Sequence, residues 1–212
     1  GIDFEVVPGI TSAISAPAYA GIPVTHRGLS THVTVVTGHE DPAKGSTDVD
    51  WEALAAAGGT LVILMGVGRL EEIAQQLVAG GRDPSTPVAA VTRGTRPDQE
   101  SCRTTLGEVA DAGIRGLSPP SVIVVGAVAA LDLSWFEKRP LFGRTVVVTR
   151  AREQASRLRQ SLESLGARVI ELPTIHIDNV SFSLPELSAY GWIIFTSANG
   201  VRAFFERGLA PA

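Results

Sequence analysis

Residues 6–27 contain a compact group of small, polar and charged side chains that could bind a ligand. An apolar run ends there at Pro8-Gly9, and a stretch built mainly from Ala, Ser and Gly follows it. Side chains this small fill little core volume, but they let the backbone approach a neighbour or a ligand closely. A Gly-Ile-Pro exit at 21–23 then places a Thr, a His and an Arg in a loop at 25–27. These residue types alone fit a ligand-binding segment or a tight loop-helix-loop in an α/β core.

The elements that would position this segment alternate in type along the chain. Apolar, β-branched runs predict strands at 31–37, 60–65, 87–92, 101–106, 121–125, 145–149, 168–172 and 192–195. Helical spacing predicts helices at 51–57, 69–79, 108–112 and 153–165, with another at 201–205. This order predicts an α/β fold. In the last part, strand-helix-strand order predicts a parallel sheet.

Composition and charge exclude several classes of protein. The single cysteine, Cys102, excludes an intrachain disulfide framework and fits a reducing compartment, so we expect a cytoplasmic protein. With no second thiol and only 4 His, no metal site is expected. No apolar run has the length of a membrane span, so no membrane partner is expected.

The charge balance changes sign along the chain. Residues 1–133 hold 8 Lys+Arg against 15 Asp+Glu, whereas residues 134–212 hold 10 against 7. The mixture of aromatic, charged, Pro and Gly residues at 134–143 predicts a partly packed connector between units at 1–133 and 144–212. The excess of three positive charges in the second unit could attract an anionic small molecule, but it is far too small to indicate nucleic-acid binding.

Further landmarks accompany the opening segment, in a fixed order. They are Thr37-Gly38-His39, Asp50-Trp51-Glu52-Ala53-Leu54, Leu64-Met65-Gly66, Pro87-Val88-Ala89, Gly94-Thr95 and Ser118-Pro119-Pro120. With these landmarks, residues 1–131 resemble the tetrapyrrole methylases, and most closely their uroporphyrinogen-III C-methyltransferase branch. The resemblance implies a mixed sheet with helices, S-adenosylmethionine as methyl donor, a tetrapyrrole substrate and a homodimer formed through the methylase part.

The resemblance also implies site residues for the methyl donor. Thr11 and Ser12 would contact the donor, Met65 would line the adenosine pocket and Gly94 would offer its backbone. A soft Met suits an adenine face, and Gly removes a side chain where a ligand must lie against the backbone. The plainer alternatives are a gap-filling Met in a core and a Gly in an ordinary turn.

For the substrate, the resemblance implies Thr25, His26 and Arg27. The family substrate carries many carboxylates, and the guanidinium of Arg27 is a bidentate carboxylate donor. A solvated loop charge is the alternative. His39 with Glu40 and Asp41 is assigned to a solvated loop, because the spacing is too local and too acidic for zinc.

The donor-binding glycine motif of the family is missing. No G-x-G-x-x-G or Gly-Pro-Gly-Asp segment occurs, the chain starts without Met, and it stops just after an expected helix. We therefore expect an internal segment that holds the C-terminal lobe of the methylase and leaves the catalytic residues unknown.

The second unit resembles the first part of uroporphyrinogen-III synthase. The matching residues are 143–151, Leu165-Gly166-Ala167, Leu172-Pro173-Thr174-Ile175 and Ile194-Phe195-Thr196-Ser197-Ala198-Asn199-Gly200-Val201. The resemblance implies cyclisation of hydroxymethylbilane to uroporphyrinogen III. It also implies substrate binding by residues that end strands ahead of helices, namely Thr149, Arg150, Thr196, Ser197 and Asn199. In a parallel sheet these residues would share the carboxyl edge, where such folds bind ligands. Ordinary helix capping is the alternative.

The two resemblances support each other, because one enzyme makes the compound that the other consumes. They predict a fused methyltransferase and synthase of sirohaem or cobalamin biosynthesis. The alternatives are another tetrapyrrole methylase, such as a precorrin methyltransferase, a methylase acting on a macromolecule, or a binding segment without turnover of its own.

Overall fold

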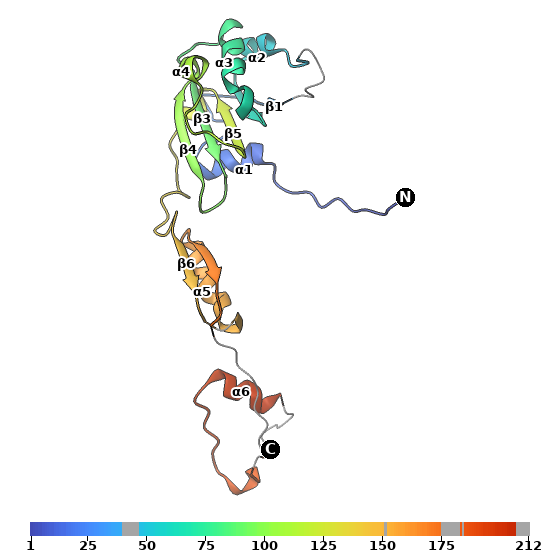
Figure 1. Ribbon diagram of the computed structural model, residues 1–212, viewed down its shortest axis with the longest axis vertical. Coiled ribbons are helices and arrows are strands. Elements are labelled where there is room, and N and C mark those ends of the chain that lie inside the picture. Colours follow the sequence, from blue (N-terminus) through green and yellow to red (C-terminus); the bar gives the residue numbers. More distant parts are fainter. Residues whose placement is uncertain (40–46, 151, 175–182, 184, 207–212) are drawn as a thin grey trace.

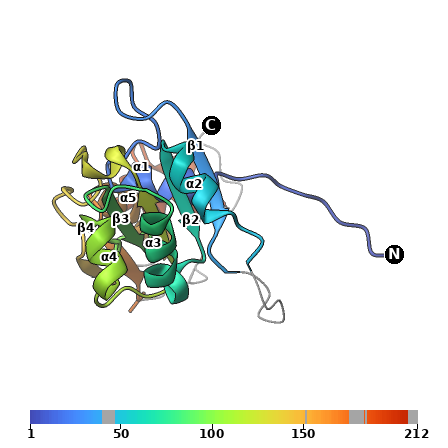
Figure 2. The same ribbon diagram turned by 90° about the horizontal axis from the view of Figure 1, so that it is seen from above.

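The computed structural model describes residues 1–39, 47–150, 152–174, 183 and 185–206 (Figure 1). Residues 1–10 have no regular secondary structure and run away from the first lobe (Figure 2). Across the described ranges, no helix has the length and apolar character needed to cross a membrane.

The first lobe is built on one mixed sheet of five strands. In spatial order these are β1 (Val33–Thr37), β2 (Thr60–Leu64), β5 (Ser121–Val125), β3 (Pro87–Thr92) and β4 (Glu100–Thr105). A helical crossover makes β1 and β2 parallel, whereas β5 runs antiparallel to both of its neighbours, β2 and β3. The mixed α/β architecture expected from the sequence is confirmed.

Helices cover both faces of this sheet. The helices α2 (Trp51–Ala57), α3 (Leu70–Ala79) and α4 (Leu106–Ala112) pack on one face, while α1 (Ser12–Tyr19) and a 3-10 turn at Ala127–Ala130 pack on the other. Strand β2 shows the division, because Leu61 and Ile63 face α3 while Val62 belongs to the cluster with α1. A strand buried on both faces reads as a continuous apolar run, which explains the composition of β2 and β5.

The small residues of α1 have a packing reason. Ala13 and Ala16 are buried against the sheet. A Cβ built on Gly94 would lie only 2.5 Å from the Cβ of Ala16. The run of small side chains therefore lets α1 approach the end of β3 closely. The packing of α1 therefore accounts for these small side chains by a close helix contact.

The connector 134–143 packs on α1 through aromatic rings. Phe136 is 5% exposed, and its ring centroid lies 4.8 Å from that of Tyr19 and 5.4 Å from that of Phe142. The indole N–H of Trp135 donates a hydrogen bond of 3.1 Å to the carbonyl of Ala18. The connector is therefore partly packed against α1.

Beyond the connector, a separate two-stranded parallel sheet is formed by β6 (Thr145–Val148) and β7 (Arg168–Glu171), with α5 (Arg152–Ser164) as the crossover. The parallel pairing is as predicted.

The third strand predicted for this sheet, at residues 192–195, is wrong. These residues have no strand pairing, and the side chains of Trp192 and Ile194 are 86% and 84% exposed. An apolar run becomes a strand only when another strand lies beside it. In Figure 1 this segment and the following helix, α6 (Ala198–Phe205), lie well apart from β6 and β7.

Candidate functional site

A pocket of about 760 Å³ opens in the first lobe, where the ends of β2 and β3 meet the start of β5. Because β5 is antiparallel to both neighbours, its first residues lie at the same sheet edge as their last ones. The N-terminal half of α1 forms a further wall. The lining residues are Ile10, Ser12, Ser15, Ala16, His39, Leu64, Met65, Val67, Gly68, Val91, Arg93, Gly94, Thr95, Arg96, Pro119, Pro120, Ser121 and Val122.

The structure thus brings three of the four residues expected to bind the methyl donor to one pocket. Ser12, Met65 and Gly94 come from three separate segments and line it together. Thr11 is outside the lining and caps α1 instead, because its hydroxyl accepts a hydrogen bond of 3.3 Å from the amide of Ala13. The role of each residue toward a ligand stays a prediction.

Three non-glycine residues at this pocket have left-handed backbone conformations. Met65, Arg93 and Thr95 have φ values of 55°, 50° and 72°, and they are the non-glycine residues of the described ranges with positive φ. All three line the pocket. Left-handed conformations cost free energy for residues with a Cβ, and such residues cluster at ligand sites. Sequence reasoning missed this strain at all three residues, because the backbone conformation of a non-glycine loop residue has no local signature.

The loop after β3 is held rigid by charged and amide groups. The guanidinium of Arg93 pairs with Glu100 and, at 3.2 Å, with Asp98. The amide of Thr95 donates a hydrogen bond of 2.8 Å to the side-chain oxygen of Gln99, which is 3% exposed. These bonds favour the left-handed conformations of Arg93 and Thr95.

Gln99 links this loop to the connector. Its side-chain amide donates a hydrogen bond of 2.7 Å to the carboxylate of Glu137, which also accepts one of 2.9 Å from the hydroxyl of Ser101. The sequence analysis missed Gln99 and Glu137. No periodic signal joins residues 38 positions apart, so only tertiary structure could pair them.

The loop expected to bind the substrate is separate from the pocket. Thr25, His26 and Arg27 are exposed, and the amide of His26 donates a hydrogen bond of 3.0 Å to the carbonyl of Ser30. These residues are not among those that line the pocket. By contrast, His39 lines the pocket, although its sequence context predicted a solvated loop. Glu40 and Asp41 lie outside the described residues. In the described part of the chain, no three His, Cys, Asp or Glu residues form a cluster that could hold a metal ion.

The substrate-binding residues expected in the second unit do not share a sheet edge. Arg150 follows β6, whereas Thr196 and Ser197 precede α6 and Asn199 lies in its first turn; the expected third strand before this helix is absent. The hydroxyl of Ser197 caps α6 by accepting a hydrogen bond of 3.0 Å from the amide of Gly200. The carbonyl of Thr149 accepts a hydrogen bond of 3.2 Å from the amide of Thr174, after β7. The argument from a shared carboxyl edge is therefore wrong for this structure.

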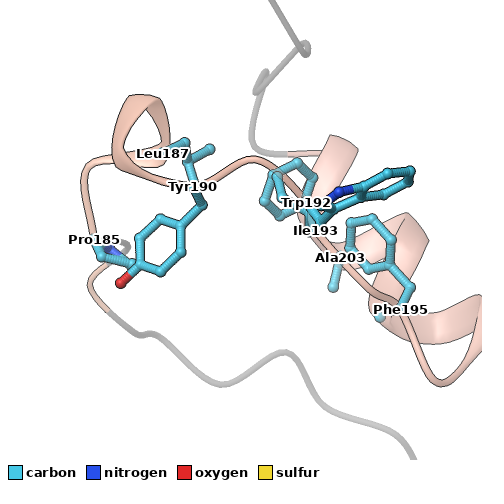
Figure 3. Close-up of a pocket in the computed structure, with 9 residues that line it drawn as sticks. Pro185, Leu187, Tyr190, Trp192, Ile193, Phe195 and Ala203 are labelled. Carbon is cyan, nitrogen blue, oxygen red and sulfur yellow. The ribbon is translucent and has the colours of Figure 1, made fainter.

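A second, almost wholly apolar pocket lies beside α6. Figure 3 shows its lining, with Tyr190, Trp192 and Phe195 on the chain before the helix and Ala203 on the helix itself. Phe195 and Phe204 meet edge to face, with ring centroids 5.2 Å apart. This pocket offers few polar groups to orient a polar substrate.

Comparison with known proteins agrees with both resemblances. Residues 1–110 match the model of the tetrapyrrole (corrin/porphyrin) methylases, and residues 156–211 match that of uroporphyrinogen-III synthase HemD. Because the first match covers more than half of the chain, the chain belongs to the tetrapyrrole methylase family. The family prediction is confirmed, and the synthase match confirms the second resemblance.

Several curated relatives are similar over long stretches. The S-adenosyl-L-methionine-dependent uroporphyrinogen III methyltransferase of Methanosarcina barkeri is 55% identical over 131 residues, which are 61% of this chain and 51% of that protein. The uroporphyrinogen-III C-methyltransferase of Bacillus subtilis is 39% identical over 97% of this chain and 44% of its own length. The porphyrin biosynthesis protein HemD of Ruminiclostridium josui is 36% identical over 97% of this chain and 42% of its own length. The chain therefore spans about half or less of these relatives.

Solved structures share the fold of the first lobe. Uroporphyrin-III C-methyltransferase from Thermus thermophilus, in complex with S-adenosyl homocysteine, has a TM-score of 0.52 and 37% identity, covering 61% of this chain and 53% of that one. The cobalamin biosynthetic enzyme cobalt precorrin-4 methyltransferase has a TM-score of 0.54 and 26% identity, covering 61% of this chain and 54% of that one.

Proposed function

We propose that this chain carries the donor-binding lobe of an S-adenosylmethionine-dependent uroporphyrinogen-III C-methyltransferase, joined to a segment of a uroporphyrinogen-III synthase. The convergence of Ser12, Met65 and Gly94 on one pocket carries the proposal. Relatives named as uroporphyrinogen-III methyltransferases support it, and the synthase match favours uroporphyrinogen III over a later precorrin as the substrate.

The pocket fits the proposed donor in size and in lining. Pockets for ligands of this size commonly measure about 300–1,000 Å³ and are mostly apolar, with a few polar groups. Leu64, Met65 and Val67 give the lining apolar side chains, and Ser12 and Ser15 on α1 add hydroxyl groups to it. This combination suits a molecule with an adenine ring at one end and polar groups at the other.

When bound, S-adenosylmethionine supplies an activated methyl group for transfer to a pyrrole carbon. The contribution of this chain is orientation, which can supply several kcal/mol of barrier lowering. The ion pairs of Arg93 hold the strained loop of Gly94 and Thr95 in place before any ligand arrives, so less ordering is needed on binding.

Binding of S-adenosylhomocysteine to the chain, measured by isothermal titration calorimetry, tests the donor site. Wild type should bind, and Met65→Glu should weaken binding at least tenfold, because it places a carboxylate in the apolar wall. Arg115→Gln is the control, since Arg115 is exposed and outside the pocket lining. Absence of binding by the wild-type chain would overturn the proposal.

A chimaera tests the activity. We propose that the chain alone transfers no methyl group to uroporphyrinogen III, because it has no glycine-rich donor loop. Substituting the first lobe for the matching segment of the Methanosarcina relative should preserve radiolabelled methyl transfer, given their 55% identity. Turnover by the isolated chain, or an inactive but folded chimaera, would contradict this part.

We further propose a homodimer formed through the methylase part and a cytoplasmic location. Exposed apolar side chains of the N-terminal segment, such as Ile2, Phe4 and Val7, support a further packing partner there. The free thiol of Cys102 fits a reducing compartment. Sedimentation velocity tests the dimer, and a monomer at micromolar concentration would refute it.

A further inference from the structure

Another pocket, which we call the junction pocket, lies between the first lobe and the unit of β6, α5 and β7. It measures about 460 Å³ and is lined by Tyr19, Thr95, Arg96, Pro97, Asp98, Phe136, Arg139, Glu163, Gly166, Ala167, Arg168 and Val169. Four parts of the chain contribute to it: the end of α1, the loop after β3, the connector, and the segment from the end of α5 to the start of β7.

Backbone contacts join the connector to two of the other parts. The amide of Gly143 donates a hydrogen bond of 3.2 Å to the carbonyl of Pro97, and the amide of Leu141 donates one of 2.9 Å to that of Leu165. At Gly166, φ is 97°, and a Cβ built there would lie 2.9 Å from the Cβ of Arg139. Only glycine fits this turn without strain, which lets Arg139 lie directly against it.

The pocket carries positive charge without matching negative charge. Of its two acidic residues, Asp98 already pairs with Arg96 at 3.1 Å, and Glu163 pairs with Arg159 at 2.8 Å. Neither Arg139 nor Arg168 has a carboxylate within ion-pair distance among the residues that the structure describes. Two guanidinium groups are thus available to a ligand.

Aromatic rings position one of these groups. The guanidinium carbon of Arg139 lies 4.8 Å from the ring centroid of Trp135 and 4.8 Å from that of Phe136. Stacking on aromatic faces restricts an arginine side chain while it leaves the edge N–H groups free to donate. A preorganised guanidinium of this kind suits a planar carboxylate, which accepts two parallel hydrogen bonds.

The junction pocket adjoins the proposed donor pocket. Thr95 and Arg96 line both of them, so the loop after β3 is a wall common to the two spaces. A ligand that spans this loop would place one part among the arginines and another beside the donor.

We propose that the junction pocket binds the carboxylates along one edge of a tetrapyrrole, with Arg139 and Arg168 as their donors. The nature of the ligand rests on the proposed function, whereas the binding of carboxylates rests on the charges of the pocket itself. A site shared by the two units would keep a polycarboxylate product of one unit close to the donor pocket of the other.

The test uses uroporphyrin III, a stable oxidised form of uroporphyrinogen III, and follows its fluorescence anisotropy as the 212-residue chain is added. The double variant Arg139→Gln/Arg168→Gln should weaken binding by about tenfold for each arginine, as expected for charge-assisted hydrogen bonds. The matched control Arg115→Gln/Arg157→Gln removes the same charge from exposed residues outside the pocket lining and should bind as wild type does.

Two further measurements keep the proposal falsifiable. The double variant could unfold because it loses the contacts of Arg139 with the aromatic rings. Arg168 is exposed, so Arg168→Gln alone should fold and should bind uroporphyrin III about tenfold more weakly than wild type. Inorganic phosphate at a similar concentration should not displace the porphyrin. Equal affinity of Arg168→Gln and the control double variant, or displacement by phosphate, would overturn the proposal.

Binding of S-adenosylhomocysteine separates this inference from the proposed function. If the chain binds S-adenosylhomocysteine but not uroporphyrin III, only the junction site fails. If it binds the porphyrin through Arg139 and Arg168 but not S-adenosylhomocysteine, the junction site stands and the donor pocket fails.

Discussion

Substituting Gly94 by Ala tests how the first lobe holds its pocket. The added Cβ would lie 2.5 Å from the Cβ of Ala16 and 3.1 Å from its Cα, whereas Val91 at 3.5 Å is an ordinary contact. Carbon atoms prefer a separation of about 3.5–4.0 Å, so α1 or the loop must move by about 1 Å. Either movement changes a wall of the pocket.

The expected loss of stability follows from this overlap. Adding a methyl group to a well-packed site typically costs about 1–3 kcal/mol, and the backbone of Gly94 is not left-handed, so no dihedral strain adds to it. Gly94→Ala should therefore lower the free energy of unfolding by about 1–3 kcal/mol and weaken S-adenosylhomocysteine binding as well.

Urea unfolding followed by circular dichroism measures the loss. Gly68→Ala is the matched control, since Gly68 lines the same pocket but a Cβ there meets nothing within 4 Å. Pairing Gly94→Ala with Ala16→Gly removes the closest contact and should recover part of the stability beyond the sum of the single changes. Equal stability of Gly94→Ala and Gly68→Ala would refute the packing argument.

Three further predictions concern the strain, the connector and the helix cap. Met65→Gly should leave stability unchanged or raise it by up to about 1 kcal/mol, because φ is 55°, yet weaken S-adenosylhomocysteine binding in calorimetry. Phe136→Ala should cost about 3–5 kcal/mol in urea unfolding and speed proteolysis of the connector. Hydrogen bonds from the Thr104 hydroxyl and the Thr105 amide hold the pKa of Glu108 below its usual 4.5. As the pH falls through this lowered pKa, Glu108 is protonated and the free energy of unfolding of wild type should decrease. The free energy of unfolding of Glu108→Gln should depend less on acid pH.

Each of these has an outcome that would contradict it. Full binding by Met65→Gly would mean that the strained side chain does not contact the ligand. An unchanged proteolysis pattern for Phe136→Ala would mean that the aromatic cluster does not hold the connector. If the free energies of unfolding of wild type and Glu108→Gln change in parallel between about pH 7 and pH 3, the helix cap of Glu108 does not contribute to destabilisation by acid.

Sequence patterns located most elements of the first lobe, although they gave α1 only as part of a possible loop-helix-loop. Local signals were sufficient there: the apolar run of β2, the helical spacing of α3 and the glycine pairs that end two helices each act within a few residues. The landmark motifs likewise located Ser12, Met65 and Gly94, because each lies within its own motif.

The convergence of these three residues on one pocket depends on the tertiary structure, and so does the absence of a strand at 192–195 in the second unit. The antiparallel direction of β5 brings the ends of β2 and β3 together as a pocket, and strand direction is not encoded in an apolar run. The bond between Gln99 and Glu137 and the junction arginines depend on how distant segments pack. For the same reason the apolar run at 192–195 misled the prediction, since a strand forms only where a partner strand supplies its hydrogen bonds.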